Sequence, residues 1–294
     1  MCISFFFFFQ AEDGIRDKLV MEFRRVLFRS PERPVDKTGF GSGIPELDTL
    51  LGSFHPGDLI VLTGASQSAN SELALNIAFN VANEYRVNKG QAGAVVGYMS
   101  SGQSVADLSA LVLARETKLP LWMVSEGILS DDEFSKILNC GLGLSHLPLH
   151  IDDSLPLTIS AVRTRARGLK RASGLGLLVV DELEALTIRL PEGMENTSGW
   201  GVAENLKALA QELEMPILVT SSSLGQDGKA GVETNLKILA DVVLKFPANL
   251  ERLQEGANGV QEIVVIKNSH GSVGSAQFDL GQRSDLFSVI GNVP

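Results

Sequence analysis

The chain has 294 residues, and its 25 lysine and arginine side chains against 35 aspartate and glutamate side chains give a formal net charge of −10 at pH 7. This acidic balance argues against broad, nonspecific binding of duplex nucleic acid, although a local basic strip could still hold a single strand. Cys140 is the only cysteine after residue 30, so a disulfide framework is excluded, and no apolar run after residue 30 reaches the roughly 18 residues of a membrane span. We therefore expect a soluble protein of the reducing cytoplasm.

The first thirty residues differ in character from the rest of the chain. Five phenylalanines at 5–9 form an apolar run that is too short for a membrane span. A secretory signal would need a positively charged region before this run and a small-residue cleavage site after it, and neither is present. Residues 10–30 look like translated sequencing adapter, and the phenylalanine run looks like translated poly-T. We therefore expect the native sequence to begin near Pro31.

Apolar runs typical of buried strands alternate with segments of helical periodicity from residue 59 onward. The predicted strands span residues 59–63, 94–100, 149–152, 175–181, 216–221, 242–246 and 262–267. The predicted helices span residues 72–84, 105–117, 131–141, 159–171 and 201–213. Ser130 and Glu133 form a capping box at the start of the third helix. This alternation favours an α/β fold with a mainly parallel central sheet flanked by helices.

The turn between the first predicted strand and the first predicted helix has the outline of a phosphate-binding loop, GASQSANS at 64–71. In the pattern G-x-x-x-x-G-K-[ST], backbone N–H groups surround phosphates and the lysine reaches the β/γ oxygens. Gly64 and the hydroxyl of Ser71 are kept here, but Ala69 and Asn70 replace the second glycine and the lysine. The sequence predicts the shape of a nucleotide site without its main positive charge, and an ordinary strand–turn–helix connection is the alternative.

Further motifs, in the family's order, resemble the C-terminal ATPase domain of DnaB-type replicative helicases. They are TGF at 38–40, PGDLI at 56–60, LPLHIDD at 147–153, GLGLLVVD at 174–181, ADVV at 240–243 and a final lysine with two glycines at 267–274. The resemblance covers residues 38–294 and implies a RecA-like P-loop NTPase fold there. Residues 31–37 would be the remnant of an interdomain linker, and the family's helical N-terminal domain would be missing by truncation.

The resemblance also implies cofactors, ATP and Mg²⁺, and the residues that would hold them. The residues implied to form the nucleotide site are Gly64, Ala69, Asn70, Ser71, Asp181, Ser222 and Lys267. Ser71 and Asp181 are the implied Mg²⁺ ligands, through a hydroxyl and a carboxylate oxygen. Because the Asn70 amide cannot supply the charge of a lysine, we expect nucleotide binding to be weak.

Three catalytic positions depart from the family's pattern. Gly102 stands where the resemblance places a catalytic glutamate, and a glycine cannot orient water. Ser222 stands at the sensor glutamine position, and Ser269 stands at the arginine-finger position, two residues after the retained Lys267. Glu182 directly follows Asp181 and could polarise water in place of the missing glutamate, or could be an exposed residue at a strand end.

The four histidines, His55, His146, His150 and His270, are scattered along the chain. No pair of them has the spacing typical of zinc ligands. From the sequence we therefore expect no histidine metal site.

Relative to the family's pattern, the apolar core positions are kept while the catalytic positions change. This favours a domain that keeps the fold but has lost ATP hydrolysis. We expect a hydrolysis-deficient DnaB-type domain that acts as a binding or regulatory subunit. It would lie in a ring of its own copies or in a ring with active DnaB-type subunits, and in the family this ring is a hexamer. The alternatives are an active ATP-dependent 5′–3′ DNA helicase and a decaying gene. Single-stranded DNA is an implied but weakened partner, because residues 231–234 lack the family's Arg-Glu element, although the helix at 159–171 keeps a basic face.

Overall fold

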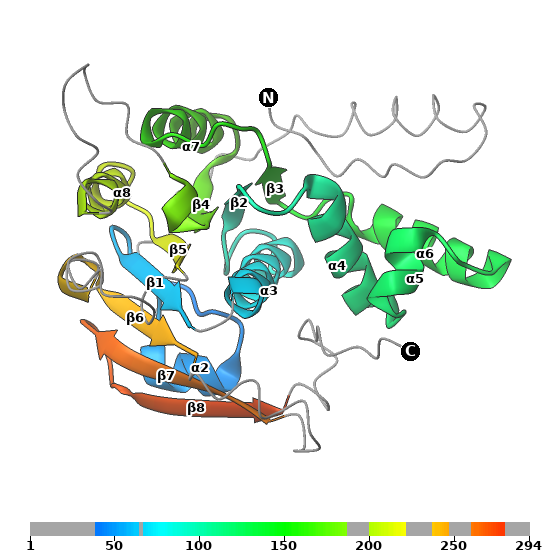
Figure 1. The fold of residues 1–294 in the computed structure, drawn as a ribbon, viewed down its shortest axis with the longest axis horizontal. Helices are drawn as coiled ribbons and strands as arrows, with labels where there is room; N and C mark the ends of the chain where they lie inside the picture. Colours follow the sequence, from blue (N-terminus) through cyan, green and yellow to red (C-terminus); the bar gives the residue numbers. More distant parts are fainter. Residues whose placement is uncertain (1–38, 65–66, 187–199, 222–236, 247–259, 280–294) are drawn as a thin grey trace.

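The computed structural model describes residues 39–64, 67–186, 200–221, 237–246 and 260–279. These residues form one eight-stranded sheet with helices on both of its faces (Figure 1). Within the described residues, no helix is both long and apolar enough to cross a membrane. The expected adapter segment and linker remnant, residues 1–37, lie outside the described ranges.

The sheet is parallel over six strands and antiparallel at one edge. Its strands are β1 (Leu59–Thr63), β2 (Val95–Ser100), β3 (Leu149–Asp152), β4 (Leu175–Asp181), β5 (Ile217–Ser221), β6 (Val242–Lys245), β7 (Val260–Asn268) and β8 (Gly274–Asp279). Their order in space is β3-β2-β4-β5-β1-β6-β7-β8, and the pairs β6–β7 and β7–β8 are antiparallel. The mainly parallel sheet predicted from the sequence is confirmed, and β8 is an additional strand.

Strand β1 lies inside the sheet, with β5 on one side and β6 on the other. All five of its residues are buried, which explains why it is a continuous apolar run and not an alternating one. Its register with β5 pairs Thr63 with Ser221, and the register of β2 with β4 pairs Ser100 with Asp181. The carboxyl ends of four parallel strands are therefore brought to one edge of the sheet.

Among the described residues, the helices confirm the five predicted helical segments, and the short helices α2 and α5 are additional. They are α2 (Pro45–Leu51), α3 (Gln67–Val87), α4 (Val105–Thr117), α5 (Leu121–Glu126), α6 (Asp131–Leu144), α7 (Ile159–Ser173) and α8 (Trp200–Glu212), with a 3-10 turn, η1 (Leu183–Ala185). The capping box of α6 is present, because Ser130 and Glu133 exchange side chain–backbone contacts at its N-terminus. Helix α3 begins five residues before the predicted start, so it includes the end of the candidate phosphate loop.

Two hydrophobic cores lie on the two faces of the sheet. Ile60 and Leu62 of β1 belong to the core that contains α2, α3 and α4 residues. Leu59 and Val61 belong to the core that contains α7 and α8 residues. Because strand side chains alternate between faces, one short strand serves both cores, and each fully buried leucine or valine contributes roughly 1.5–3 kcal/mol to stability. The sheet is thereby held rigidly beneath the edge where the candidate site lies.

Candidate functional site

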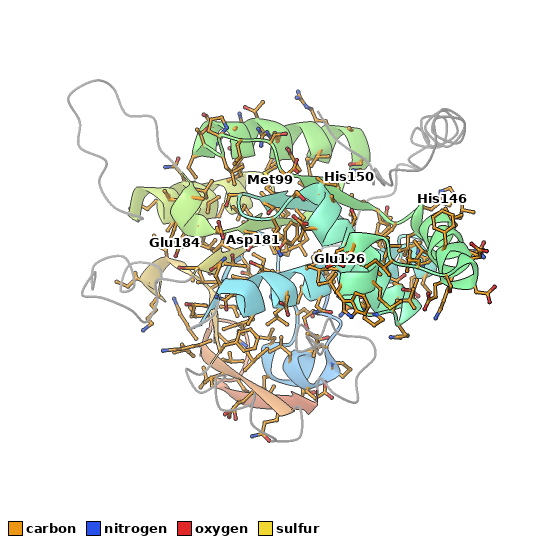
Figure 2. The ribbon with its side chains drawn as sticks, turned by 45° about the vertical axis from the view of Figure 1, so that its right-hand side comes forward. Met99, Glu126, His146, His150, Asp181 and Glu184 are labelled. Carbon is orange, nitrogen blue, oxygen red and sulfur yellow. The ribbon has the colours of Figure 1, made fainter. Side chains whose placement is uncertain are left out.

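The candidate site lies where the carboxyl ends of β1, β2, β4 and β5 meet the N-terminal end of α3. Asp181 closes β4, Ser221 closes β5, and Asn70 and Ser71 lie near the start of α3. Figure 2 shows Asp181 in the interior beside α3, with Glu184 near it. A helix N-terminus in this place presents backbone N–H groups and a partial positive charge to an anion.

Asn70, at the position of the missing lysine, is fully buried and belongs to the protein interior. Its Nδ2 donates to the carbonyl oxygen of Ser221 at 3.3 Å, and its Oδ1 has no hydrogen-bond partner among the described residues. A Cβ at Gly64 would lie 2.7 Å from Cβ of Phe246 and 3.2 Å from Oδ1 of Asn70, which explains the retained glycine. Ala69 packs against the core on the α3 side. Gly64, Ala69 and Asn70 are therefore closely packed, but the buried side chain in the lysine position is neutral.

The two expected Mg²⁺ ligands contact each other directly. Ser71 Oγ donates to Oδ1 of Asp181 at 2.8 Å. Neighbouring oxygen ligands of an octahedral Mg²⁺ ion lie about 2.9 Å apart, so the hydroxyl and the carboxylate fit this ion in both chemistry and separation. The Asp181 carboxylate also accepts a hydrogen bond from Thr220 Oγ1 at 2.6 Å and one from the hydroxyl of Tyr98 at 3.0 Å.

The charge around Asp181 is negative. Burial raises the pKa of Tyr98 well above its usual value, and the charges of Asp181, Glu182 and Glu72 raise it further, so the Tyr98 hydroxyl stays protonated and donates. Burial also raises the pKa of Glu72 to about 8. Among the described residues, no lysine or arginine forms an ion pair with Asp181 or Glu182. In the described part of the site, the charge of a triphosphate would therefore meet carboxylates that are not neutralised by a cationic side chain.

Glu182 lies against the position of the missing catalytic glutamate. A Cβ built on Gly102 would lie 2.6 Å from Oε1 of Glu182, so the Glu182 carboxylate occupies the space where a side chain at position 102 would begin. Ser101 Oγ donates to Oε2 of Glu182 at 3.0 Å. Glu182 has a φ of 69°, unusual for a non-glycine residue, and its N–H donates to Thr220 Oγ1 at 2.8 Å. The backbone turn directs Glu182 back toward the end of β2.

Lys267 and Ser269, at the end of β7 and just after it, bind backbone carbonyl oxygens of their own chain. The ammonium of Lys267 donates to the carbonyl oxygens of Lys237, Ile238 and Ala240, at 3.0, 3.0 and 2.5 Å. An ammonium has three donors, and these three bonds use all of them. Ser269 Oγ donates to the carbonyl oxygen of Asp241 at 3.1 Å. The predicted role of Lys267 in a neighbouring subunit's site would therefore require it to leave these contacts.

The structure adds site residues that the sequence argument missed. Tyr98 and Thr220 both bind Asp181, and Gln67 Nε2 donates to Thr220 Oγ1 at 3.2 Å. The sequence indicated these residues only weakly, since each is a single polar residue in a strand or at a helix end, near the carboxyl ends of the predicted strands. Ser222, the sensor position, lies outside the described residues, as does the segment 231–234 of the expected DNA-binding loop.

The basic face of α7 is partly neutralised. Arg167 Nε donates to Oε1 of Glu212 on α8 at 2.7 Å, and Arg165 lies 3.4 Å from the carboxylate of Asp152 on β3. Arg167 is about half exposed, so this pair contributes little to stability. These contacts favour the simpler interpretation of this basic helix, a solvated face that forms ion pairs with neighbouring elements, over a DNA-binding face.

Comparison with known proteins relates this arrangement to one family. A family model described as "DnaB-like helicase C terminal domain" matches residues 39–229. The replicative DNA helicase DnaB of Rickettsia prowazekii is 33% identical over 187 residues, covering 62% of this chain and 38% of that protein. The DnaB of Rickettsia conorii is 29% identical over 293 residues, covering 87% of this chain and 57% of that protein. The chain therefore spans less than two thirds of the length of these relatives.

A solved structure of a DnaB-like replicative helicase superimposes with a TM-score of 0.71 at 16% identity, covering 94% of this chain and 66% of that one. A KaiC-like protein of Pyrococcus horikoshii superimposes with a TM-score of 0.55 at 19% identity, covering 86% of this chain and 98% of that one. These likenesses confirm the RecA-like α/β fold. With the family model matching most of the chain, the conclusion is that this chain belongs to the DnaB-like helicase C-terminal domain family.

Proposed function

We propose that this chain is a DnaB-type domain that binds ATP and Mg²⁺ weakly, does not hydrolyse ATP at a useful rate, and acts as a binding or regulatory subunit in a ring with DnaB-type subunits. The family's own role is ATP-dependent DNA unwinding. The single observation that carries the proposal is the buried, neutral Asn70 at the position of the loop lysine, with its amide bonded to the backbone of β5.

The expected loss of rate follows from the charges that the site lacks. Removing one preorganised donor to developing charge typically costs a factor of about 10²–10³ in rate. An arginine finger contributes roughly 10³–10⁵ in phosphoryl transfer, and its position here is Ser269. The two losses together leave a nucleotide bound by backbone N–H groups and by Mg²⁺ on Ser71 and Asp181. The reacting γ-phosphate then has neither the loop lysine nor the arginine finger to stabilise its charge.

A second candidate function is an active ATPase in which Glu182 replaces the family's glutamate. The observation that favours it is the position of the Glu182 carboxylate at Gly102, in contact with Ser101. In this case Glu182 would accept a proton from the attacking water while Ser71 and Asp181 hold Mg²⁺. The missing lysine charge weighs against this candidate.

The first test is ATP hydrolysis by the full chain, with and without single-stranded DNA. We expect no hydrolysis above the rate of a protein-free sample, from a chain that circular dichroism shows to be folded. DNA-stimulated hydrolysis would contradict the proposal. If that hydrolysis is lost in Glu182→Gln and kept in Glu126→Gln, an exposed glutamate on α5, the second candidate is supported. A chain that fails to unfold cooperatively would favour the decaying gene.

A restored variant provides the positive comparison. Asn70→Lys with Ser269→Arg returns both cationic side chains, and Gly102→Glu returns the glutamate. Because a Cβ at Gly102 would lie 2.6 Å from Oε1 of Glu182, this variant also needs Glu182→Ala as a fourth substitution, which removes both the steric overlap and the second carboxylate. We expect this variant to bind a fluorescent ATP analogue more tightly than the unmodified chain does, in the presence of Mg²⁺.

A further inference from the structure

A tight turn immediately before β1 carries two candidate ligands, His55 and Asp58. Pro56 and Gly57 occupy its central positions, the N–H of Asp58 donates to the carbonyl oxygen of His55 at 3.1 Å, and Gly57 has a φ of 86°. A positive φ at the third residue is the mark of a type II turn, which proline and glycine favour. The Asp58 carboxylate folds back over the turn, and its Oδ2 accepts the backbone N–H of His55 at 2.8 Å.

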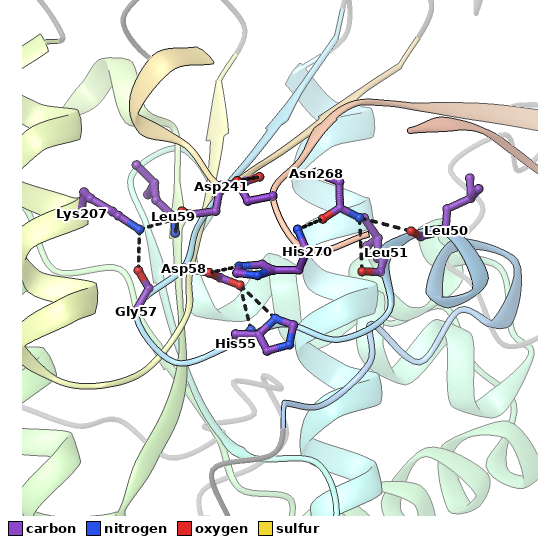
Figure 3. A network of polar contacts seen from close by, with 11 residues as sticks. Leu50, Leu51, His55, Gly57, Asp58, Leu59, Lys207, Asp241, Asn268 and His270 are labelled. Carbon is purple, nitrogen blue, oxygen red and sulfur yellow. Dashed lines mark hydrogen bonds and ion pairs between the residues drawn. The ribbon is translucent and has the colours of Figure 1, made fainter. Parts of the chain in front are cut away.

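The third candidate ligand, His270, comes from the opposite end of the chain. Strand β7 runs antiparallel to β6, so its last residues return to the end of the sheet where β1 begins. Asn268 anchors this segment, because its Nδ2 donates to three backbone carbonyl oxygens and its Oδ1 accepts the N–H of His270 at 3.0 Å. Nε2 of His270 then lies 2.9 Å from Oδ1 of Asp58 (Figure 3).

The three side chains each offer one donor atom, and these atoms all lie within 4.8 Å of one another. Nδ1 of His55 is buried, lies 3.6 Å from Oδ2 of Asp58, and has no hydrogen-bond partner among the described residues. The rings of His55 and His270 have centroids 4.3 Å apart. An unpartnered imidazole nitrogen beside a second imidazole and a carboxylate is a donor set that a metal ion would satisfy.

We propose that His55, Asp58 and His270 bind a divalent transition-metal ion, with Zn²⁺ as the best match. Zinc takes imidazole nitrogen and carboxylate oxygen at about 2.0–2.2 Å, so neighbouring donors in its tetrahedron lie about 3.3 Å apart. Nε2 of His270 lies 2.9 Å from Oδ1 of Asp58, and Nδ1 of His55 lies 3.6 Å from Oδ2, so each histidine nitrogen faces one oxygen of the same carboxylate. With the three donor atoms within 4.8 Å of one another, a small rotation of these side chains brings them to the separation that zinc requires. Three protein ligands leave one tetrahedral position for water or another ligand.

The surrounding charges favour a cation. Asp58 is buried, and among the described residues no lysine or arginine forms an ion pair with it. Lys207, which belongs to the same polar network, donates to the carboxylate of Asp241 and to the carbonyl oxygen of Gly57 (Figure 3). A metal ion bound to both histidines would neutralise the buried Asp58 carboxylate.

The proposed metal site is separate from the candidate nucleotide site. Asp58 directly precedes β1, whereas the phosphate loop and Ser71 follow its other end. Five strand residues span roughly 16 Å, so the sites lie at opposite edges of the sheet. Metal binding can therefore be measured without nucleotide, and its outcome does not depend on whether the chain hydrolyses ATP.

The test is direct metal binding by the full chain, purified without a polyhistidine tag and freed of metal with a chelator. Zn²⁺ is added alone and measured by equilibrium dialysis, and Co²⁺ is used as a probe because its visible absorption reports tetrahedral coordination by nitrogen and oxygen. We expect one Zn²⁺ per chain, a tetrahedral Co²⁺ spectrum, and an increase in Tm with Zn²⁺. His55→Gln and His270→Gln should each weaken Zn²⁺ binding at least about tenfold.

These two variants are chosen because their side chains are 40% and 36% exposed, so folding should survive their replacement, whereas Asp58 is 5% exposed and supports the turn. His146→Gln, at an exposed histidine in the turn after α6 (Figure 2), is the matched control and should bind Zn²⁺ like the unmodified chain. Zn²⁺ binding that is equal in His270→Gln and in the unmodified chain would overturn the proposal. So would an unmodified chain that binds no Zn²⁺ and gives only the octahedral Co²⁺ spectrum.

Discussion

The hydroxyl of Tyr98 provides the sharpest test of the polar network around Asp181. Tyr98 is fully buried, and its hydroxyl donates to Oδ2 of Asp181 at 3.0 Å. Tyr98→Phe removes this one oxygen and leaves the ring in place. The Asp181 carboxylate, itself buried, keeps the hydroxyls of Ser71 and Thr220 on its other oxygen, so Oδ2 alone loses its donor.

The magnitude follows from the charge of the acceptor. A hydrogen bond to a charged group contributes about 1.5–3 kcal/mol, and a buried acceptor left without a donor keeps its desolvation cost. We therefore expect Tyr98→Phe to lower the free energy of unfolding by about 2 kcal/mol. For a domain of this size, that corresponds to a decrease in Tm of roughly 4–8 °C.

Urea unfolding followed by circular dichroism measures this change. The midpoint should fall while the slope of free energy against urea concentration stays the same, because the same surface is exposed on unfolding. Tyr85→Phe is the matched control, since Tyr85 is only half-buried and lies on α3 away from Asp181. Its free energy of unfolding should change by less than about 0.5 kcal/mol. If the two variants lose the same free energy, the Tyr98 hydroxyl does not stabilise the Asp181 carboxylate.

Three further predictions concern the scaffold. Burial lowers the pKa of His150 below its usual value, so as the pH falls below about 6.5 the imidazole is protonated in the unfolded chain before it is protonated in the folded chain. The free energy of unfolding should therefore fall more in the unmodified chain than in His150→Gln, and His146→Gln is the control. Gly93→Ala should lower the free energy of unfolding by more than about 3 kcal/mol, because its Cβ would lie 2.3 Å from a backbone oxygen at a φ of 70°. Gly127→Ala, with a φ of 71° and open space around it, should lower it by only about 1–2 kcal/mol. Urea unfolding of both variants separates steric overlap from backbone strain. Ser104→Ala removes the capping box of α4 and should cost about 1 kcal/mol by the same measurement, and an unchanged midpoint would show that the box does not stabilise the helix.

The sequence by itself determined seven strands, the five longer helices and the family, but not β8 or the short helices α2 and α5. Apolar runs such as residues 59–63 are confirmed as buried parallel strands, and the alternation of strands with helices implied the layered α/β fold. Ser71 and Asp181 could be proposed as partners because their motifs place Ser71 at the start of the helix after β1 and Asp181 at the end of β4, and the two side chains are in contact. Local periodicity contains this information because it depends only on which residues face the core.

The tertiary structure decided which distant segments meet. Nothing in the local pattern joins His270 to Asp58 across 212 residues, and His55 and His270, which are far apart in the sequence, lie side by side in the fold. The contact of Glu182 with Gly102, and the bonds of Lys267 to its own chain, likewise depend on strand order and on one unusual backbone turn. Such contacts arise from the register of the strands in the sheet, which the pattern of a single segment does not encode.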